Sequence, residues 1–143
     1  MQIQPYLFFD GRCQEAIDFY RQALGAEVVA IMRFKENPDI PTDAMPPEMA
    51  DKVMHAALKI GQSTVLASDG QCTGQQPKPQ GFSLALSPAT DAEAERLFAV
   101  LAEGGEIQMP MAETFFASRF GALVDRFGIS WMIHVDTRAP ATA

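Results

Sequence analysis

The chain contains two copies of one sequence pattern, and this internal repeat constrains the fold more than any other feature. Residues 16–28 (AIDFYRQALGAEV) and residues 95–107 (ERLFAVLAEGGEI) align at an offset of 79, which pairs Phe19 with Phe98. Both stretches have the apolar spacing of an amphipathic helix, followed by glycine and by strand-forming residues. A duplication of this length predicts two copies of one small structural unit.

A second similarity follows each copy of the first. Residues 56–69 resemble residues 121–136 when two extra residues are allowed in the later turn, and an offset of 67 then pairs Leu66 with Ile133. Each half is therefore expected to contain a strand, a helix, a second strand and a strand–turn–strand hairpin. The duplication predicts two sheets related by a pseudo-twofold axis, with a functional site at their junction.

In the first half, Asp10 follows an apolar run and is expected to cap a helix over residues 13–24. Gly25 marks the end of that helix. Gly61-Gln62 predicts the turn of a hairpin. The strands of this half are expected at residues 3–9, 27–34, 53–60 and 64–67.

In the second half, Thr90 and Glu93 form a capping box that predicts a helix beginning at residue 91. Gly104-Gly105 is expected to end it. Pro110 predicts that its strand lies at a sheet edge or bulge, because proline has no N–H to donate. The strands of this half are expected at residues 82–86, 106–111, 115–125 and 129–135.

These elements predict one domain over residues 1–136, built from modules of about residues 1–69 and 81–136. Residues 70–80 are interpreted as the connector and residues 137–143 as a loose tail. Residues 35–52 contain four prolines and no regular period, and a loop of this length in a compact domain is usually functional or disordered.

Composition excludes several classes of partner. The 143-residue chain has a formal net charge of −7, which argues against binding to a nucleic-acid backbone. No apolar run is long enough to span a membrane. The two cysteines and the absence of a secretory signal sequence favour a cytoplasmic protein with reduced thiols.

Several short stretches, in this order and spacing, resemble one protein family. They include YLFFDG at 6–11, LAEGG at 101–105, MPM at 109–111 and DRFGISW at 125–131. The chain resembles the vicinal oxygen chelate superfamily (glyoxalase I, extradiol dioxygenases, and fosfomycin and bleomycin resistance proteins), and within it the PhnB-like branch, also described as 3-demethylubiquinone methyltransferase-like. The resemblance implies an α+β fold in which duplicated βαβββ modules form two curved mixed sheets around a cavity, with the helices outside.

The resemblance also implies where a metal would be bound. In metal-using relatives, His, Glu or Gln side chains hold a divalent ion that acts as a Lewis acid. The matching positions here are Pro5 or Tyr6, Phe82 or Ser83, Val65 and Met132. None of these is a histidine or a carboxylate, so the standard metal site is expected to be absent and no cofactor is predicted.

A metal at different positions is the alternative. His55 and His134 are the only histidines, and with Glu113 or Asp69 they would make a set of two histidines and one carboxylate. The competing interpretation is that each histidine is simply a hydrogen-bonded strand residue.

The chain has more aromatic and thioether side chains than two thin sheets require for packing. Such side chains suit a pocket for a flat ligand, although any one of them is more often part of a core. The predicted pocket residues are Tyr6, Phe8, His55, Phe82, Met109, Phe116, Trp131 and Met132.

The function predicted from the sequence is therefore the binding of a small hydrophobic or aromatic molecule between the modules, without a metal. The alternative is a metal-dependent lyase, isomerase or oxygenase with noncanonical ligands around His55; no catalytic residue is assigned. The chain has no G-x-G-x-x-G loop for a methyl donor, which speaks against a literal methyltransferase. The resemblance implies a homodimer, in which residues 35–52 would close over their own chain or over the partner.

Overall fold

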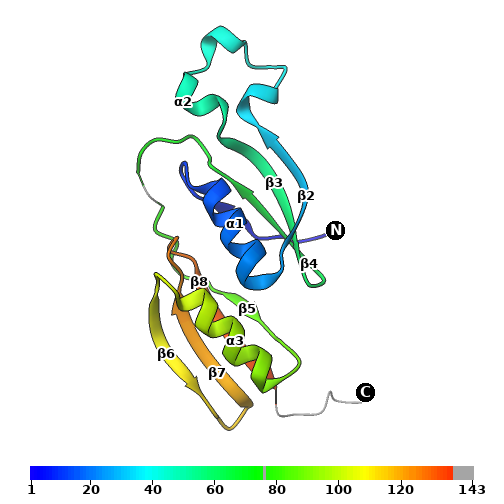
Figure 1. Ribbon diagram of the computed structural model, residues 1–143, viewed down its shortest axis with the longest axis vertical. Helices are drawn as coiled ribbons and strands as arrows, with labels where there is room; N and C mark the ends of the chain where they lie inside the picture. The colour runs from blue at the N-terminus through cyan, green and yellow to red at the C-terminus, as the bar shows by residue number, and fades with distance from the viewer. Residues whose placement is uncertain (76, 137–143) are drawn as a thin grey trace. The chain divides into compact units, whose positions relative to one another are not determined.

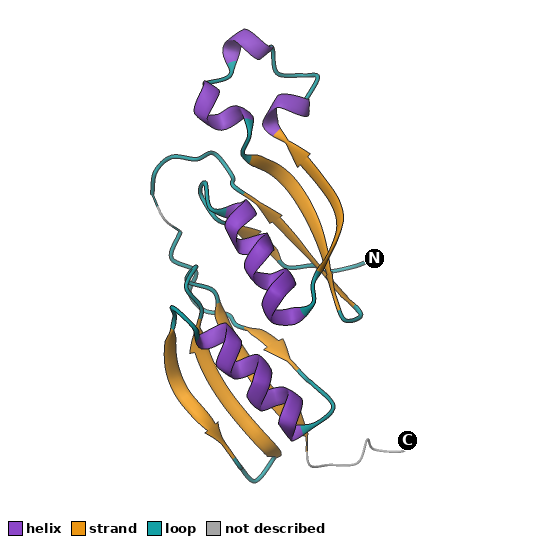
Figure 2. Cartoon of the chain, viewed as in Figure 1, coloured by secondary structure: helices purple, strands orange, loops and turns teal. Residues whose placement is uncertain are grey.

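The structure is a computed structural model that describes residues 1–75 and 77–136 (Figures 1 and 2). The predicted tail at residues 137–143 lies outside the described residues. The chain forms two compact units that divide between Pro77 and Lys78. We call these the first module and the second module and describe each by itself.

The first module is a four-stranded mixed sheet with one helix against it (Figure 2). The strands lie in the order β1-β4-β3-β2, with β1 parallel to β4 and the other pairs antiparallel. Its elements are β1 (Tyr6–Phe8), α1 (Cys13–Leu24), β2 (Glu27–Arg33), β3 (Val53–Ile60) and β4 (Ser63–Ser68).

Helix α1 forms where the apolar spacing predicts it. The helix buries six side chains that recur at helical spacing: Cys13, Ala16, Ile17, Phe19, Tyr20 and Ala23. Gly25 ends the helix in the left-handed conformation (φ 67°), as predicted, because glycine adopts positive φ without steric cost. The prediction that Asp10 caps the helix is wrong. The N-cap position is Arg12, and the carboxylate that accepts hydrogen bonds there belongs to Asp69.

The proline-rich segment between β2 and β3 contains short helical turns rather than only loop. These turns are η1 (Phe34–Glu36), η2 (Thr42–Ala44) and α2 (Pro47–Ala50). Prolines favour the first positions of such turns because their φ is already helical. Phe34 and Met45 are buried and anchor the segment, which a search for long apolar periods overlooks.

The second module repeats the plan with different lengths. Its strands lie in the order β5-β8-β7-β6, and β5 is the strand that pairs in parallel, with β8. Pro110 lies in the edge strand β6, as predicted, and the Thr90 side chain accepts a hydrogen bond from the Glu93 N–H at 3.2 Å. The elements are β5 (Leu84–Leu86), α3 (Asp91–Ala102), β6 (Glu106–Ala112), β7 (Ala117–Val124) and β8 (Ser130–Asp136). The α+β class and the paired mixed sheets are as predicted.

Strand register shows which residues of the two modules correspond, more accurately than the sequence alignment does. Tyr6 pairs with Leu66 in the first module, and Ala85 pairs with Met132 in the second. The offset of 79 therefore holds for β1 and β5, as it does for β2 and β6, whereas β4 and β8 correspond at 66 rather than the expected 67. The difference arises because the β7–β8 turn is longer than the β3–β4 turn by one residue, not by the expected two. It matters because a shift of one residue reverses the face of every side chain.

Candidate functional site

The face of the first sheet opposite α1 carries the exposed aromatic side chains of that module. Cross-strand pairs place Tyr6, Leu66 and Ala57 in one row on this face, because paired residues point to the same side of a sheet. Phe8 follows Tyr6 two residues along β1, and His55 precedes Ala57 by two residues along β3. The structure therefore brings together three of the predicted pocket residues, and we call this surface the open face.

The three side chains contact one another directly. The rings of Tyr6 and Phe8 stack in parallel, with centroids 4.9 Å apart and an interplanar angle of 3°. The Tyr6 hydroxyl lies 2.8 Å from Nδ1 of His55, and the two rings meet edge to face. Both aromatic rings remain accessible, Tyr6 at 40% and Phe8 at 50%. Partial burial raises the pKa of the Tyr6 phenol, to which the nearby Cys13 thiol adds, so the hydroxyl keeps its proton at neutral pH.

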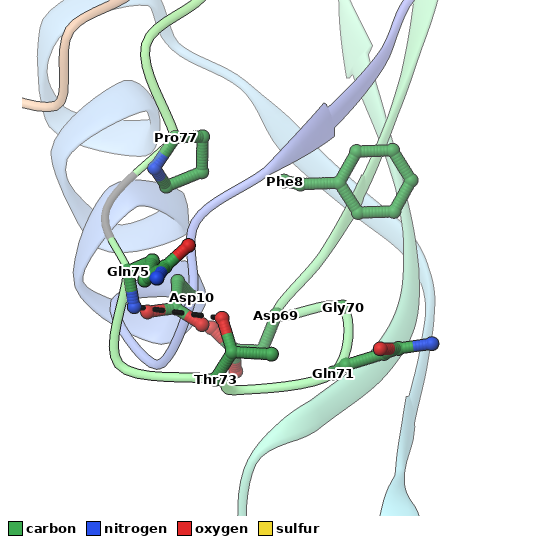
Figure 3. A pocket seen from close by; sticks show the side chains of 8 residues that line it. All are labelled: Phe8, Asp10, Asp69, Gly70, Gln71, Thr73, Gln75 and Pro77. Carbon is green, nitrogen blue, oxygen red and sulfur yellow. Dashed lines mark hydrogen bonds between the residues drawn. The ribbon is translucent and has the colours of Figure 1, made fainter.

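A cavity of about 270 Å³ lies next to the open face and shares Phe8 with it (Figure 3). Figure 3 shows Phe8 on one side and the connector side chains Gln75 and Pro77 on the other, with Asp10 and Asp69 also in the lining. The complete lining is Phe8, Asp10, Asp69, Gly70, Gln71, Thr73, Gln75 and Pro77. Except for Phe8, the sequence did not single these residues out as pocket residues. The one sequence signal for this region is the Asp69-Gly70 pair that follows the hairpin.

The Asp69 carboxylate links three backbone segments beside the cavity. Its Oδ1 accepts hydrogen bonds from the backbone N–H groups of Gly11 (2.7 Å) and Cys13 (2.8 Å), and its Oδ2 accepts one from Val53 (2.8 Å). Three donors to a buried carboxylate make strong, charge-assisted hydrogen bonds. Asp69 is only 2% exposed, so the carboxylate joins β4 to the start of α1 and to the start of β3.

Two residues near the cavity have positive φ without being glycine. Asp10, in the lining, has φ 46°, and Cys72, in the connector loop, has φ 51°. Such conformations cost about 1–3 kcal/mol each and persist where surrounding contacts hold them.

Neither thiol of the first module is suited to nucleophilic chemistry. Complete burial and then the Asp69 carboxylate raise the pKa of the Cys13 thiol far above its ordinary value. Partial burial, followed by Asp69 and Asp10, also raises the pKa of Cys72. Both thiols are therefore protonated at neutral pH, and thiols are much weaker nucleophiles than thiolates.

The second module presents apolar side chains on the corresponding face of its own sheet. Met109 pairs with Ala122, which pairs with Met132, so the two predicted methionines share this face. Phe116 packs edge to face on Phe120, at a centroid distance of 5.3 Å. Phe82 precedes β5 and is 52% exposed.

Trp131, which was predicted to line the pocket, lies in the core of the second module. Its side chain is 2% exposed and lies on the α3 side of the sheet, between Leu84 and Leu123 in the register. Its indole N–H donates to the Asp125 carboxylate at 2.9 Å. Trp131 is therefore a core residue of the second module, and strand alternation separates it from its neighbour Met132.

The positions that hold a metal in metal-using relatives do not fit a metal here. The register makes Leu66, not Val65, the counterpart of Met132, and Ala85 the counterpart of Tyr6. Val65 is buried on the opposite face, beneath α1. Apolar side chains and one neutral phenol do not supply the imidazole and carboxylate donors that a divalent ion prefers.

The histidines have hydrogen-bond partners within their own modules. His55 pairs with Tyr6, whereas His134 has Ser87 at 2.9 Å from Nε2 and Asp136 at 3.4 Å from Nδ1. Asp69, proposed as a third ligand, already accepts three backbone hydrogen bonds. Within residues 1–75 and 77–136, no three His, Cys, Asp or Glu side chains lie close enough together to hold a metal ion.

In the described part of the chain, no helix combines the length and the apolar character needed to cross a membrane.

A family model and several known proteins match nearly the whole chain. The family model described as 3-demethylubiquinone-9 3-methyltransferase matches residues 1–134. Protein YjdN from Escherichia coli (strain K12) is 36% identical over 148 residues, which cover 98% of this chain and 99% of YjdN.

Solved structures agree with this match. Protein PA1353 from Pseudomonas aeruginosa is 41% identical with a TM-score of 0.82, covering 95% of this chain and 98% of that one. A putative 3-demethylubiquinone-9 3-methyltransferase, PhnB protein, from Bacillus cereus is 27% identical with a TM-score of 0.76, covering 94% and 99%. A glyoxalase-related enzyme from Fulvimarina pelagi, at 17% identity and a TM-score of 0.61 over 95% and 88%, shares the fold.

Proposed function

The chain belongs to the 3-demethylubiquinone-9 3-methyltransferase family, in the PhnB-like branch of the vicinal oxygen chelate superfamily, and from this premise we propose that it binds a small, flat, mainly apolar molecule. The binding surface is the open face of the first module. The observation that carries the proposal is the pair of stacked, accessible rings of Tyr6 and Phe8 beside a cavity.

Exposed aromatic rings in fixed geometry favour a flat ligand. Covering ring surface removes apolar area from water, which contributes roughly 25 cal/mol per Å². A third ring placed against two ordered rings also gains the offset or edge contacts that aromatic groups prefer. A protein surface would gain the same area term, and we favour a small molecule because a cavity of about 270 Å³, close to the volumes of small-molecule sites, lies beside Phe8.

The polar groups near Phe8 would orient the ligand. The Tyr6–His55 pair lies on the open face, and Gln71, Thr73 and Gln75 line the neighbouring cavity. Ligand sites generally combine an apolar lining with a few fixed polar groups that provide specificity. The second module has a surface of similar chemical character, formed by Phe82, Met109, Phe116 and Met132.

The test measures the binding of naphthalene-class probes to purified protein by ligand-observed NMR and by thermal shift. We expect Phe8→Ala to weaken binding at least tenfold, because it removes one of the two stacked rings. The matched control is Phe115→Ala, which removes a 90% exposed ring from the second module and should leave the affinity within twofold of wild type. Equal affinity of the wild type and Phe8→Ala would show that the open face is not the site.

The same samples distinguish the alternative, a metal-dependent lyase, isomerase or oxygenase with ligands around His55. Stoichiometric divalent metal in protein purified without chelator, together with loss of probe binding in EDTA, would replace the proposal by that alternative. Probe binding that persists in EDTA supports the proposal. The homodimer implied by the resemblance is a separate prediction, which light scattering of the same samples tests.

A further inference from the structure

The Tyr6–His55 pair has hydrogen-bonding capacity that the protein itself does not use. Among the residues that the structure describes, the single side-chain hydrogen bond of Tyr6 is to His55, and that of His55 is to Tyr6. A phenol has one proton and can also accept, and a neutral imidazole has one N–H and one acceptor nitrogen. The shared hydrogen bond uses one donor and one acceptor of the pair. One donor and one acceptor therefore remain for a ligand.

The remaining donor and acceptor are available in either direction of the Tyr6–His55 hydrogen bond. If the Tyr6 hydroxyl donates to Nδ1 of His55, then Nε2–H is the free donor and the phenol oxygen retains an acceptor lone pair. If Nδ1–H donates to the phenol oxygen, then the hydroxyl is the free donor and Nε2 is the free acceptor. In both arrangements the pair presents one donor and one acceptor.

We infer that the pair recognises a hydroxyl group on a flat ring, in chemical terms a phenol or a cyclic enol. This inference rests on the proposed function, because the ring of such a ligand would lie against the Tyr6–Phe8 stack. A hydroxyl donates one hydrogen bond and accepts one, which matches the free donor and acceptor of the pair. Tyr6 belongs both to the stack, with its ring centroid 4.9 Å from that of Phe8, and to the hydrogen-bonded pair, with its hydroxyl 2.8 Å from Nδ1 of His55. One ligand would thus contact both features.

Other polar groups match the pair less well. An ether oxygen only accepts, so it leaves the acceptor of the pair without a partner. A carboxylate also only accepts, and it would bring negative charge to a chain whose formal net charge is already −7. Sites that hydrogen-bond a ligand hydroxyl discriminate strongly against analogues that lack it.

The experiment compares two probes with the same ring, 2-naphthol and 2-methoxynaphthalene, on the full chain. For the wild type we expect 2-naphthol to bind at least tenfold more tightly. Tyr6→Phe keeps the ring and removes only the hydroxyl, so we expect it to reduce this preference to less than threefold. His55→Phe should do the same, whereas His134→Phe, the matched control in the second module, should keep the full preference.

The outcomes separate this inference from the proposed function. Equal binding of the two probes by the wild type would overturn the inference while leaving the proposed function in place, and so would a tenfold preference that survives in Tyr6→Phe. Phe8→Ala should weaken both probes by the same factor, because it acts on the ring and not on the hydroxyl. Binding of neither probe by the wild type would overturn the proposed function and this inference with it.

Discussion

The two modules share strand order and a shift in strand register at equivalent places, between Val28 and Ala30 and between Ile107 and Met109. They nevertheless stabilise the start of their helix differently. In the second module the hydroxyl of Thr90, the residue next to α3, accepts the hydrogen bond. In the first module the acceptor is Asp69, which lies 56 residues after Cys13 in the sequence. The strand pattern is thus the same in both modules, whereas the residue that accepts hydrogen bonds at the start of the helix differs between them.

Each module also contains a buried carboxylate with three N–H donors, at positions that do not correspond. Asp125 accepts from Phe127, Ile129 and the Trp131 indole, all within six residues in the sequence. Asp69 accepts from groups 16 to 58 residues away and lines the cavity. The second module therefore uses its carboxylate to form a local turn, whereas the first uses its carboxylate to join distant segments beside the proposed site.

Removal of these two carboxylates should give the largest effects. Asp69→Ala leaves three N–H groups, two of them buried, without their acceptor, so we expect it to lower the free energy of unfolding by about 3–5 kcal/mol. It should also expose the Cys13 thiol to labelling, because the start of α1 is released. Urea unfolding and labelling with a thiol reagent measure the two effects.

Asp125→Ala is the matched variant for this test. We expect it to destabilise the β7–β8 turn while Cys13 of the first module stays protected. If Asp125→Ala exposes Cys13 as much as Asp69→Ala does, the assignment of separate local roles is wrong.

A smaller effect is expected where the modules differ by one methyl group. Ala26 and Gly105 are equivalent at the offset of 79, and Ala26 is buried without conflict. A Cβ at Gly105 would overlap the Val124 carbonyl oxygen, so the backbone would have to move. We expect Gly105→Ala to cost about 2–3 kcal/mol and Ala26→Gly about 1 kcal/mol. Equal losses in thermal unfolding would contradict the difference in packing.

Stability should also depend on alkaline pH through the first module, which contains both cysteines. Burial keeps Cys13 protonated in the folded chain, whereas an unfolded thiol ionises near pH 8.5. Above that pH the unfolded state binds fewer protons, so stability should fall by up to about 1.4 kcal/mol per pH unit. Unfolding midpoints between pH 7.5 and 9.5 measure this slope. Cys13→Ala should remove more of it than Cys72→Ala, and the reverse order would refute the assignment.

The smallest effect concerns the local caps. Thr90→Ala removes a side-chain cap from α3 and should cost about 1 kcal/mol. Arg12→Ala removes an N-cap residue that makes no side-chain cap hydrogen bond and whose ion pair with Glu15 is exposed, so it should cost less. Thermal unfolding of the two variants measures the difference, and a larger loss for Arg12→Ala would mean that α1 does not depend on Asp69.

Much of the fold follows from local sequence signals. Gly25, Thr90 and Pro110 act through their own backbone or through neighbouring residues, and each prediction based on them is confirmed. The Asp10 prediction was wrong because a distant carboxylate took the capping role, and no local pattern shows which of two aspartates will do so.

The candidate site was harder to predict because side-chain direction depends on register. Tyr6, Phe8 and His55 were identified from residue type, and the structure places them on one face. Trp131 has the same chemical character, but strand alternation directs it into the core. The Val65 assignment failed through a shift of one residue, since turn length cannot be inferred from strand composition.

The parallel pairing of β1 with β4 has a consequence for synthesis of the chain. Tyr6 pairs with Leu66, 60 positions later, so a ribosome releases the first strand long before its partner exists. The antiparallel strands β2, β3 and β4 can pair as each is made, but β1 gains a neighbour only after β4 has emerged. Because Asp69 follows β4 directly, α1 also lacks its acceptor until then. We therefore expect the nascent first module to remain incomplete until its last residues leave the exit tunnel, with Tyr6 and Phe8 accessible to chaperones throughout.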